Sequence, residues 1–218
     1  ELGLYDFSSN SYLQAAQLAL DQGDSSQYIS SVYQSGINLL ENGDYRMALA
    51  RGYQALSMAG NVQDSAKYAR ILNNIGDVYI SLYEESKDKK YYDSAYHYIS
   101  ESLILKGKIK DKKGRAHSLY NLGKLHLIND SDNSENPLIE AFNIWENEND
   151  KVNHAKASLK LGQYYVDRQP LIAKEYLLLS NSMSEITGDI PTQIETLSYL
   201  ADIAKRKNDL RDFSLQID

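Results

Sequence analysis

Small and hydrophobic residues recur along the chain at spacings of three and four, the pattern of a helix that buries one face. In the stretch 69–79, ARILNNIGDVY, one such stripe contains Leu72, Ile75, Gly76 and Tyr79. Gly76 would stand in the middle of a helix, where glycine costs about 1 kcal/mol relative to alanine. We therefore expect a neighbouring helix to pass too close to this position for a Cβ atom.

Four other stretches repeat this pattern. They are 29–39 (ISSVYQSGINL), 116–126 (AHSLYNLGKLH), 155–165 (AKASLKLGQYY) and 194–204 (IETLSYLADIA). The glycine-type positions are separated by 40, 47, 39 and 39 residues, and they are Gly36, Gly76, Gly123, Gly162 and Ala201. A period near 40 residues predicts a repeat protein with one insertion in the second interval.

A second amphipathic helix follows each of the first four stretches. We call the first helix of a pair helix A and the second helix B. Helix B is marked by three positions, in successive repeats Ala48, Gly52 and Ala55; Ala95, Ile99 and Ser102; Ser134, Leu138 and Ala141; and Ala173, Leu177 and Ser180. The last marker, or Ala15 before the first repeat, always precedes the next helix A by 14 residues. We therefore expect one geometry for every connection from helix B to helix A.

The connections inside the hairpins differ from one another. Gly43 can end the first helix A and Asp44 can cap the following helix B. The stretch 83–92 holds the seven-residue insertion, which we expect to lengthen both flanking helices because seven residues make about two helical turns. The polar stretch 129–137, NDSDNSENP, predicts a loop and a shortened helix B that starts near Pro137.

Both ends of the sequence read as partial repeats. Tyr12–Leu20 has the pattern of a helix B, and Asp212–Asp218 that of the start of another. Repeat arrays need polar capping repeats, so we expect these 218 residues to be a piece of a longer protein. The predicted organisation is one repeat domain over 1–218, with partial repeats at 1–28 and 194–218 and full repeats at about 29–68, 69–115, 116–154 and 155–193.

The helix pairs resemble tetratricopeptide repeats. That family has a large apolar residue at position 4, Leu-Gly at 7 and 8, Tyr at 11, Ala at 20, a bulky residue at 24 and Ala at 27. Allowing for the insertion, one repeat matches with Leu72, Ile75, Gly76, Tyr79, Ala95, Ile99 and Ser102. The next repeat matches with Leu119, Leu122, Gly123 and Ala141, although His126 replaces the tyrosine.

This resemblance covers essentially the whole chain. It implies an all-α fold, a right-handed α-solenoid of helix–turn–helix repeats. The period exceeds the family's usual 34 residues, always between helix B and the next helix A. Such long repeats resemble those of bacterial sensor kinases and transcriptional regulators.

Composition excludes several functions. The net charge is −7, from 23 basic and 30 acidic residues, which argues against nucleic-acid binding because phosphate contacts need basic side chains. The absence of cysteine excludes disulfides, thiol catalysis and thiolate metal sites. No apolar run is long enough to cross a membrane, and no signal segment is visible. Cytoplasmic and periplasmic locations both fit.

Ligand contacts are expected on helix A, which lines the concave side of a helical solenoid. By the logic of the family, positions 2, 5, 6 and 9 face this groove. The predicted contacts are Arg70, Asn73, Asn74, Asp77, His117, Tyr120, Asn121, Lys124, Lys156, Lys160 and Gln163, and Tyr33 and Glu195 extend the row. Amides can bind a peptide backbone and lysines a carboxylate. The alternative is a solvated helix face that binds nothing.

No catalytic or metal-binding constellation is found. There is no HExxH, no GxSxG and no phosphate-binding glycine loop, and the four histidines are expected at structural or surface positions. Asp130 and Asp132 alternate as in a calcium loop, but Glu135 and Ala141 stand where such a loop has glycine and glutamate. We therefore predict no enzymatic activity, no cofactor and no bound metal.

The function that these patterns favour is a non-catalytic scaffold that binds a protein or a peptide in the groove. The family resemblance further implies the sensory or regulatory region of a bacterial signal-transduction protein, a histidine kinase or a transcriptional regulator. The alternative is a structural spacer or a dimerisation arm, a homodimer with no groove ligand.

Overall fold

The computed structural model describes the backbone of residues 2–61 and 64–215 and the side chains of residues 9–60 and 64–206. Helices and short connections make up these ranges, and no strand occurs in them, which confirms the all-α class. The helices are α1 (Leu2–Asp21), α2 (Ser25–Glu41), α3 (Tyr45–Asn61), α4 (Ser65–Ser86), α5 (Lys89–Lys108), α6 (Lys112–Ile128), the 3₁₀ helix η1 (Asp132–Ser134), α7 (Glu135–Asn147), α8 (Lys151–Tyr165), α9 (Pro170–Thr187) and α10 (Ile190–Leu215).

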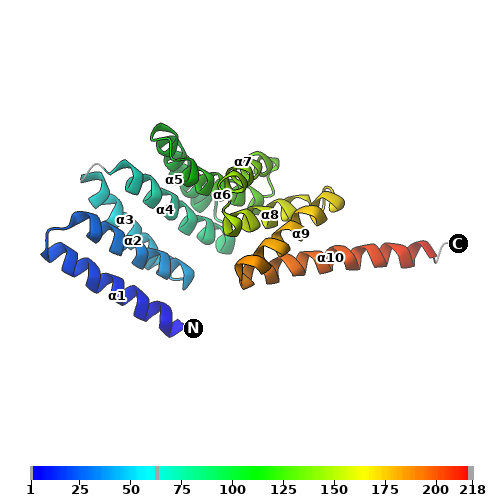
Figure 1. Cartoon of the computed structure of the whole chain (residues 1–218), viewed down its shortest axis with the longest axis horizontal. Coiled ribbons are helices and arrows are strands. Elements are labelled where there is room, and N and C mark those ends of the chain that lie inside the picture. The colour runs from blue at the N-terminus through cyan, green and yellow to red at the C-terminus, as the bar shows by residue number, and fades with distance from the viewer. Residues whose placement is uncertain (1, 62–63, 216–218) are drawn as a thin grey trace. The chain divides into compact units, whose positions relative to one another are not determined.

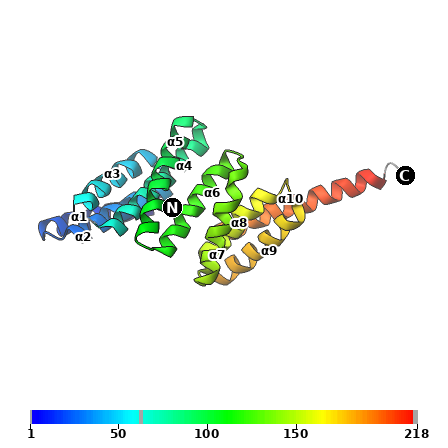
Figure 2. The same ribbon diagram turned by 90° about the horizontal axis from the view of Figure 1, so that it is seen from above.

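The chain divides into two compact units, 1–125 and 126–218. In the first unit α1 to α5 pack one against the next, and in the second α7 to α10 do the same (Figures 1 and 2). Contacts also join α2 to α4 and α8 to α10. Helices A are thus α2, α4, α6, α8 and α10, and helices B are α1, α3, α5, α7 and α9. Within each unit the helices A form one layer, the helix-A layer.

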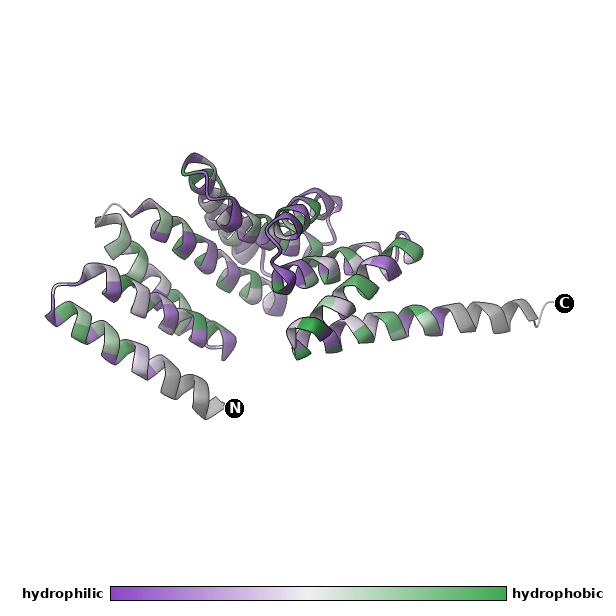
Figure 3. Ribbon diagram, viewed as in Figure 1, coloured by the Kyte–Doolittle hydropathy of each residue, from purple (hydrophilic) through white to green (hydrophobic). Residues whose placement is uncertain are grey.

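Each unit buries the apolar stripes that the sequence predicts. In the first, Ile29, Val32, Ile71 and Ile75 pack with Ala55 in one core cluster. Purple and green alternate along most helices in Figure 3, because each helix keeps a polar face outside this core. The apolar stripe of each helix therefore faces the core, and this contact sets the orientation of the helix.

Helix lengths follow the expectations for the two irregular repeats. The helices α4 and α5 have 22 and 20 residues, against 17 in each of α2 and α3, so the insertion does lengthen both. The polar stretch 129–137 contains η1, and the short α7 of 13 residues begins at Glu135, two residues before Pro137. Gly43, with φ of +80°, and the Asp44 carboxylate, which accepts from the Met47 N–H, make the predicted turn.

Every connection from helix B to helix A has the same hydrogen bonds, as the equal intervals predict. An aspartate caps each helix A by accepting the N–H three residues later at 2.8–3.3 Å, and its own N–H donates to the carbonyl five residues earlier at 2.8–3.3 Å. These residues are Asp24, Asp64, Asp111, Asp150 and Asp189. The repeated cap satisfies donors that a helix start leaves unpaired.

Gly76 and Gly162 lie where a helix B comes too close for a side chain. A Cβ built on Gly76 would stand 2.5 Å from Cγ1 of Ile99, and one on Gly162 would stand 2.6 Å from Cγ of Leu177. Ile99 and Leu177 are the middle markers of α5 and α9, and both are fully buried. The expected close approach is therefore confirmed in both units.

The last helix differs from the expectation. The helix α10 runs without a break from Ile190 to Leu215, so no new helix begins at Asp212, and residues 216–218 lie outside the described backbone. No glycine or proline occurs in 192–215, which leaves no residue that strongly terminates a helix.

A first prediction concerns the close contact at Gly76. Gly76→Ala should lower the free energy of unfolding by roughly 1–3 kcal/mol, because overpacking of Ile99 outweighs the gain in helix propensity. Gly107→Ala is the matched control, since a Cβ there meets nothing within 4 Å. Urea unfolding of both variants checks this, and a Gly76→Ala protein as stable as the control would contradict the packing.

Candidate functional site: the helix-A layer

The first unit holds a charged cluster on its helix-A layer. The guanidinium of Arg70 lies 4.8 Å from the centre of the Tyr33 ring, a cation–π contact between α4 and α2. Nζ of Lys124 on α6 lies 3.2 Å from Oδ1 of Asp77 on α4. Burial raises the pKa of the Tyr33 hydroxyl, and the charges of Arg70 and Asp77 both act on it. The predicted row is therefore cross-linked from α2 through α4 to α6.

Lys124 is tied to its own protein. Asp77 raises the pKa of Lys124 against the opposing effect of burial, and both side chains are about three-quarters covered. A partly buried pair of this kind is screened less by solvent than a surface pair. Lys124 is therefore held as a positioned charge, already neutralised by a carboxylate.

The second unit has a similar arrangement on α8 and α10. Oε1 of Glu195 accepts hydrogen bonds from Nζ of Lys160 at 3.2 Å and from Nε2 of Gln163 at 2.6 Å. Lys156, one turn before Lys160, makes no ion pair among the described residues and is half-buried. Its ammonium group is the part of this cluster with charge to offer a ligand.

The other predicted contacts differ in how much they present to solvent. Arg70 and His117 are exposed, whereas Asn121 is 6% exposed and lies within the packing. Asn73, Asn74 and Tyr120 are half-buried. The Oδ1 atom of Asn73 is buried without a hydrogen-bond partner among the described residues. Such groups are rare in folded proteins and usually have a reason.

The internal partners of the predicted lysines were not expected from the sequence. A signal was present, because Asp77 and Lys124 are both ninth in their repeats and so face one another on successive helices A. Opposite charges at the same position of successive repeats are therefore expected to pair with each other rather than with a ligand. The pairing is hidden when each helix is considered separately.

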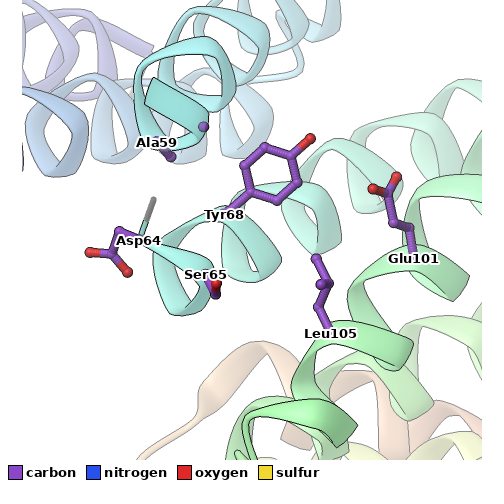
Figure 4. A pocket seen from close by; sticks show the side chains of 7 residues that line it. Ala59, Asp64, Ser65, Tyr68, Glu101 and Leu105 are labelled. Carbon is purple, nitrogen blue, oxygen red and sulfur yellow. The ribbon is translucent and has the colours of Figure 1, made fainter. Parts of the chain in front are cut away.

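The first unit also has a cavity of about 290 Å³ away from the predicted row. It is lined by residues of α3, α4 and α5 and by the cap of α4, and these are Ala59, Gly60, Asp64, Ser65, Tyr68, Glu101 and Leu105. In Figure 4 the Tyr68 ring stands between Ala59 and Leu105, with Glu101 across from it. The Asp64 carboxylate accepts a hydrogen bond from the Lys67 N–H, and this bond lowers the pKa of Asp64. The cavity thus offers one further carboxylate and no set of groups for catalysis.

A buried lysine lies outside this cavity. Lys106 is 2% exposed near the end of α5, and its Nζ donates to Oγ of Ser118 at 2.9 Å. Burial lowers the pKa of Lys106 to about 8, with Asp111 opposing the shift and Arg70 adding to it. Perturbed groups can mark active sites when they stand in a cleft. Lys106 is buried instead and is not among the residues that line the cavity.

The remaining candidates are the aspartates of the calcium-like stretch and two buried histidines. Arg168 bridges Asp130 and Asp132 at 3.4 and 3.2 Å, which occupies the carboxylates of the calcium-like stretch. His126 and His154 are buried, and burial lowers the pKa of both. Among the described side chains no group of three His, Asp or Glu residues is close enough to hold a metal ion. In the same part of the chain, no helix is both long and apolar enough to span a bilayer.

Comparison with known proteins supports the fold and goes no further. No protein-family model matches the chain, and no curated protein matches it. Among solved structures, the crystal structure of BtubC (BKLC) from P. vanneervenii is similar, with a TM-score of 0.63 and 14% identity over 94% of this chain and 92% of that one. At this identity the similarity shows a shared helical fold alone.

A second prediction follows from Lys106. At pH 7 Lys106 is charged in both the folded and the unfolded protein, so the cost of burying its charge is fully present. Between pH 8 and about 10.5 only the unfolded protein keeps the proton, so the free energy of unfolding rises with pH. Lys106→Met should therefore be more stable than the wild type at pH 7, by up to about 3 kcal/mol, and this difference should shrink toward pH 9.5.

Urea unfolding at the two pH values measures this difference. Lys108→Met is the control, because Lys108 is exposed two residues away on α5 and should give the same small offset at both pH values. A Lys106→Met protein with an unchanged offset from pH 7 to 9.5 would show that the lysine is not buried in its charged form.

Proposed function

We propose that the chain is a non-catalytic scaffold that binds a peptide or an extended protein segment on its helix-A layer. The repeated hairpins are best described as a right-handed solenoid of the tetratricopeptide-repeat type, as the matching residues at positions 4, 7, 8, 20, 24 and 27 imply. A role in bacterial signal transduction rests on the resemblance of these long-period repeats alone.

One observation carries the proposal. Arg70 is exposed and held over the Tyr33 ring, yet it makes no ion pair within the described residues. A guanidinium that is already positioned loses less conformational entropy when it binds a carboxylate, and its fork matches a carboxylate in two hydrogen bonds. Arg70 is thus a prepared anchor for an acidic side chain or a C-terminal carboxylate.

The surrounding groups suit a peptide. Asn73 and Asn74 lie one turn after Arg70 on the same helix, and both are half-buried, so amide side chains stand beside the guanidinium. Asp77 and Lys124 hold the neighbouring charges in place. Hydrogen bonds from positioned side chains to the main chain of a ligand give affinity without demanding one sequence.

The second candidate function is a structural spacer or a dimerisation arm. It is favoured by the internal pairing of Lys124 and Lys160, since these two lysines need no ligand to satisfy their charge. Light scattering separates the two, because an association that grows with protein concentration in the absence of peptide supports the arm.

A third prediction tests the scaffold. The protein is probed with an array of 12-residue peptides that vary in acidic content and carry either a free or an amidated C-terminus. Arg70→Glu should weaken binding of the acidic or free-carboxylate peptides at least tenfold, which corresponds to about 1.4 kcal/mol. Lys156→Glu tests the second unit in the same way.

Each variant has a matched control on a helix B. Lys108→Glu on α5 and Lys174→Glu on α9 place the same charge change on exposed lysines away from the helix-A layer. The proposal is wrong when wild-type protein binds no peptide of the array, or when control and test variants lose binding equally.

A further inference from the structure

The cavity of the first unit combines an aromatic ring, apolar walls and a carboxylate. The ring is that of Tyr68 on α4, and it stands between Ala59 of α3 and Leu105 of α5. The Glu101 carboxylate lies on the same side of the cavity as the hydroxyl end of this ring (Figure 4). Tyr68 is half-buried and Ala59 is fully buried, so packing holds the ring and this wall in place. All the lining residues belong to the first unit, which therefore forms the cavity by itself.

Glu101 is the charge that this cavity presents. Its Oε2 atom lies 3.9 Å from Nε2 of His97, and no lysine or arginine among the described residues pairs with it. Burial raises the pKa of the Tyr68 hydroxyl and the charge of Glu101 raises it further, so the field of the carboxylate reaches the ring. The Asp64 carboxylate, in contrast, already holds the N–H of Lys67 at 2.9 Å and its Nζ at 3.3 Å. Glu101 is thus a carboxylate with charge to offer a ligand.

These groups match an alkylammonium ion. A cation is attracted to the face of an aromatic ring, and its N–H groups can donate charge-assisted hydrogen bonds to a carboxylate. The alkyl chain of the same ligand can pack on Ala59 and Leu105, where burial of apolar surface adds affinity. An anion would be repelled by Glu101. The volume of about 290 Å³ is at the lower end for small-molecule sites, which suits a single side chain or a small amine.

We propose that this cavity binds the ammonium group of an alkylamine, either a lysine side chain of a partner protein or a free amine. The ammonium group lies between the Tyr68 ring and Glu101, and the alkyl chain lies against Ala59 and Leu105. Tyr68 and Arg70 leave α4 about 200° apart, because successive helical residues are about 100° apart. The cation site is therefore on a different side of α4 from Arg70, and it is independent of the proposed peptide binding.

The fourth prediction concerns the binding of n-butylammonium chloride. Titration at constant ionic strength should shift the backbone amide signals of Gly60, Tyr68 and Glu101 in the NMR spectrum of the isotope-labelled chain. The uncharged n-butanol has the same alkyl chain and should leave these signals unchanged. Glu101→Gln removes the charge and keeps the shape of the side chain, so it should weaken n-butylammonium binding about fivefold, the upper range for one partly exposed charge pair.

Glu84→Gln is the matched control for this variant. It makes the same change of charge on α4 of the same unit, at an exposed residue that does not line the cavity, and it should bind n-butylammonium as the wild type does. The amide spectrum of each variant shows whether it is folded. The proposal is overturned by unshifted amides at the three positions, by equal effects of n-butylammonium and n-butanol, or by equal affinity of Glu101→Gln and wild type.

A pentapeptide distinguishes the two sources of the ammonium group. It carries one lysine between glycines and has blocked ends, so its side chain is its only cation. Tighter binding of the peptide than of n-butylammonium supports a lysine of a partner protein, because main-chain contacts then add to those of the side chain. Weaker binding of the peptide supports a free amine.

Discussion

The close approach of helix B to helix A is the constraint on which the other features depend. Where Ile99 presses on Gly76 and Leu177 on Gly162, there is no room for a Cβ atom. The same side chains that fill the core thus require a residue with no side chain opposite them. Glycine lowers the intrinsic stability of α4 and α8, and the buried apolar contacts of Ile99 and Leu177 compensate for that loss.

The tight packing also shapes the buried polar groups. Oγ of Ser102 donates to the carbonyl of Ala69 at 2.6 Å, and Oγ of Ser180 donates to that of Ala155 at 2.9 Å. Each hydroxyl also meets a second hydroxyl on the next helix A, at 3.1 Å on Ser118 and 2.9 Å on Thr196. A small residue that can hydrogen-bond therefore replaces alanine without leaving an unsatisfied group.

The architecture was predictable because it rests on spacing. The positions of the small residues, the constant interval between helices and the turn residues are all local properties of the sequence, and they indicate the helix pairs, the long α4 and α5 and the short α7. The uninterrupted α10 was not predicted, since a partial match to helix B at Asp212 outweighed the lack of a helix-terminating residue between Thr192 and Leu215.

The sequence predicts where the residues of the candidate site lie, but not which of their charges are paired within the protein. The row of polar residues on helices A follows from periodicity, but whether a lysine is free depends on which carboxylate the next helix brings near it. Lys124 and Lys160 gain partners from separate helices, while Arg70 gains an aromatic ring. Asn121 is only 6% exposed, although its place in the periodic row predicts a side chain that faces a ligand.

The paired and the unpaired charges of the predicted contacts have different roles. A charge that is neutralised across two helices A ties those helices together, and a ligand would have to displace the internal partner before it could bind. A charge that is held in place but unneutralised can bind an acidic group directly. In the proposed scaffold, Arg70 in the first unit and Lys156 in the second are therefore the charges available to a ligand, while the paired lysines tie α4 to α6 and α8 to α10.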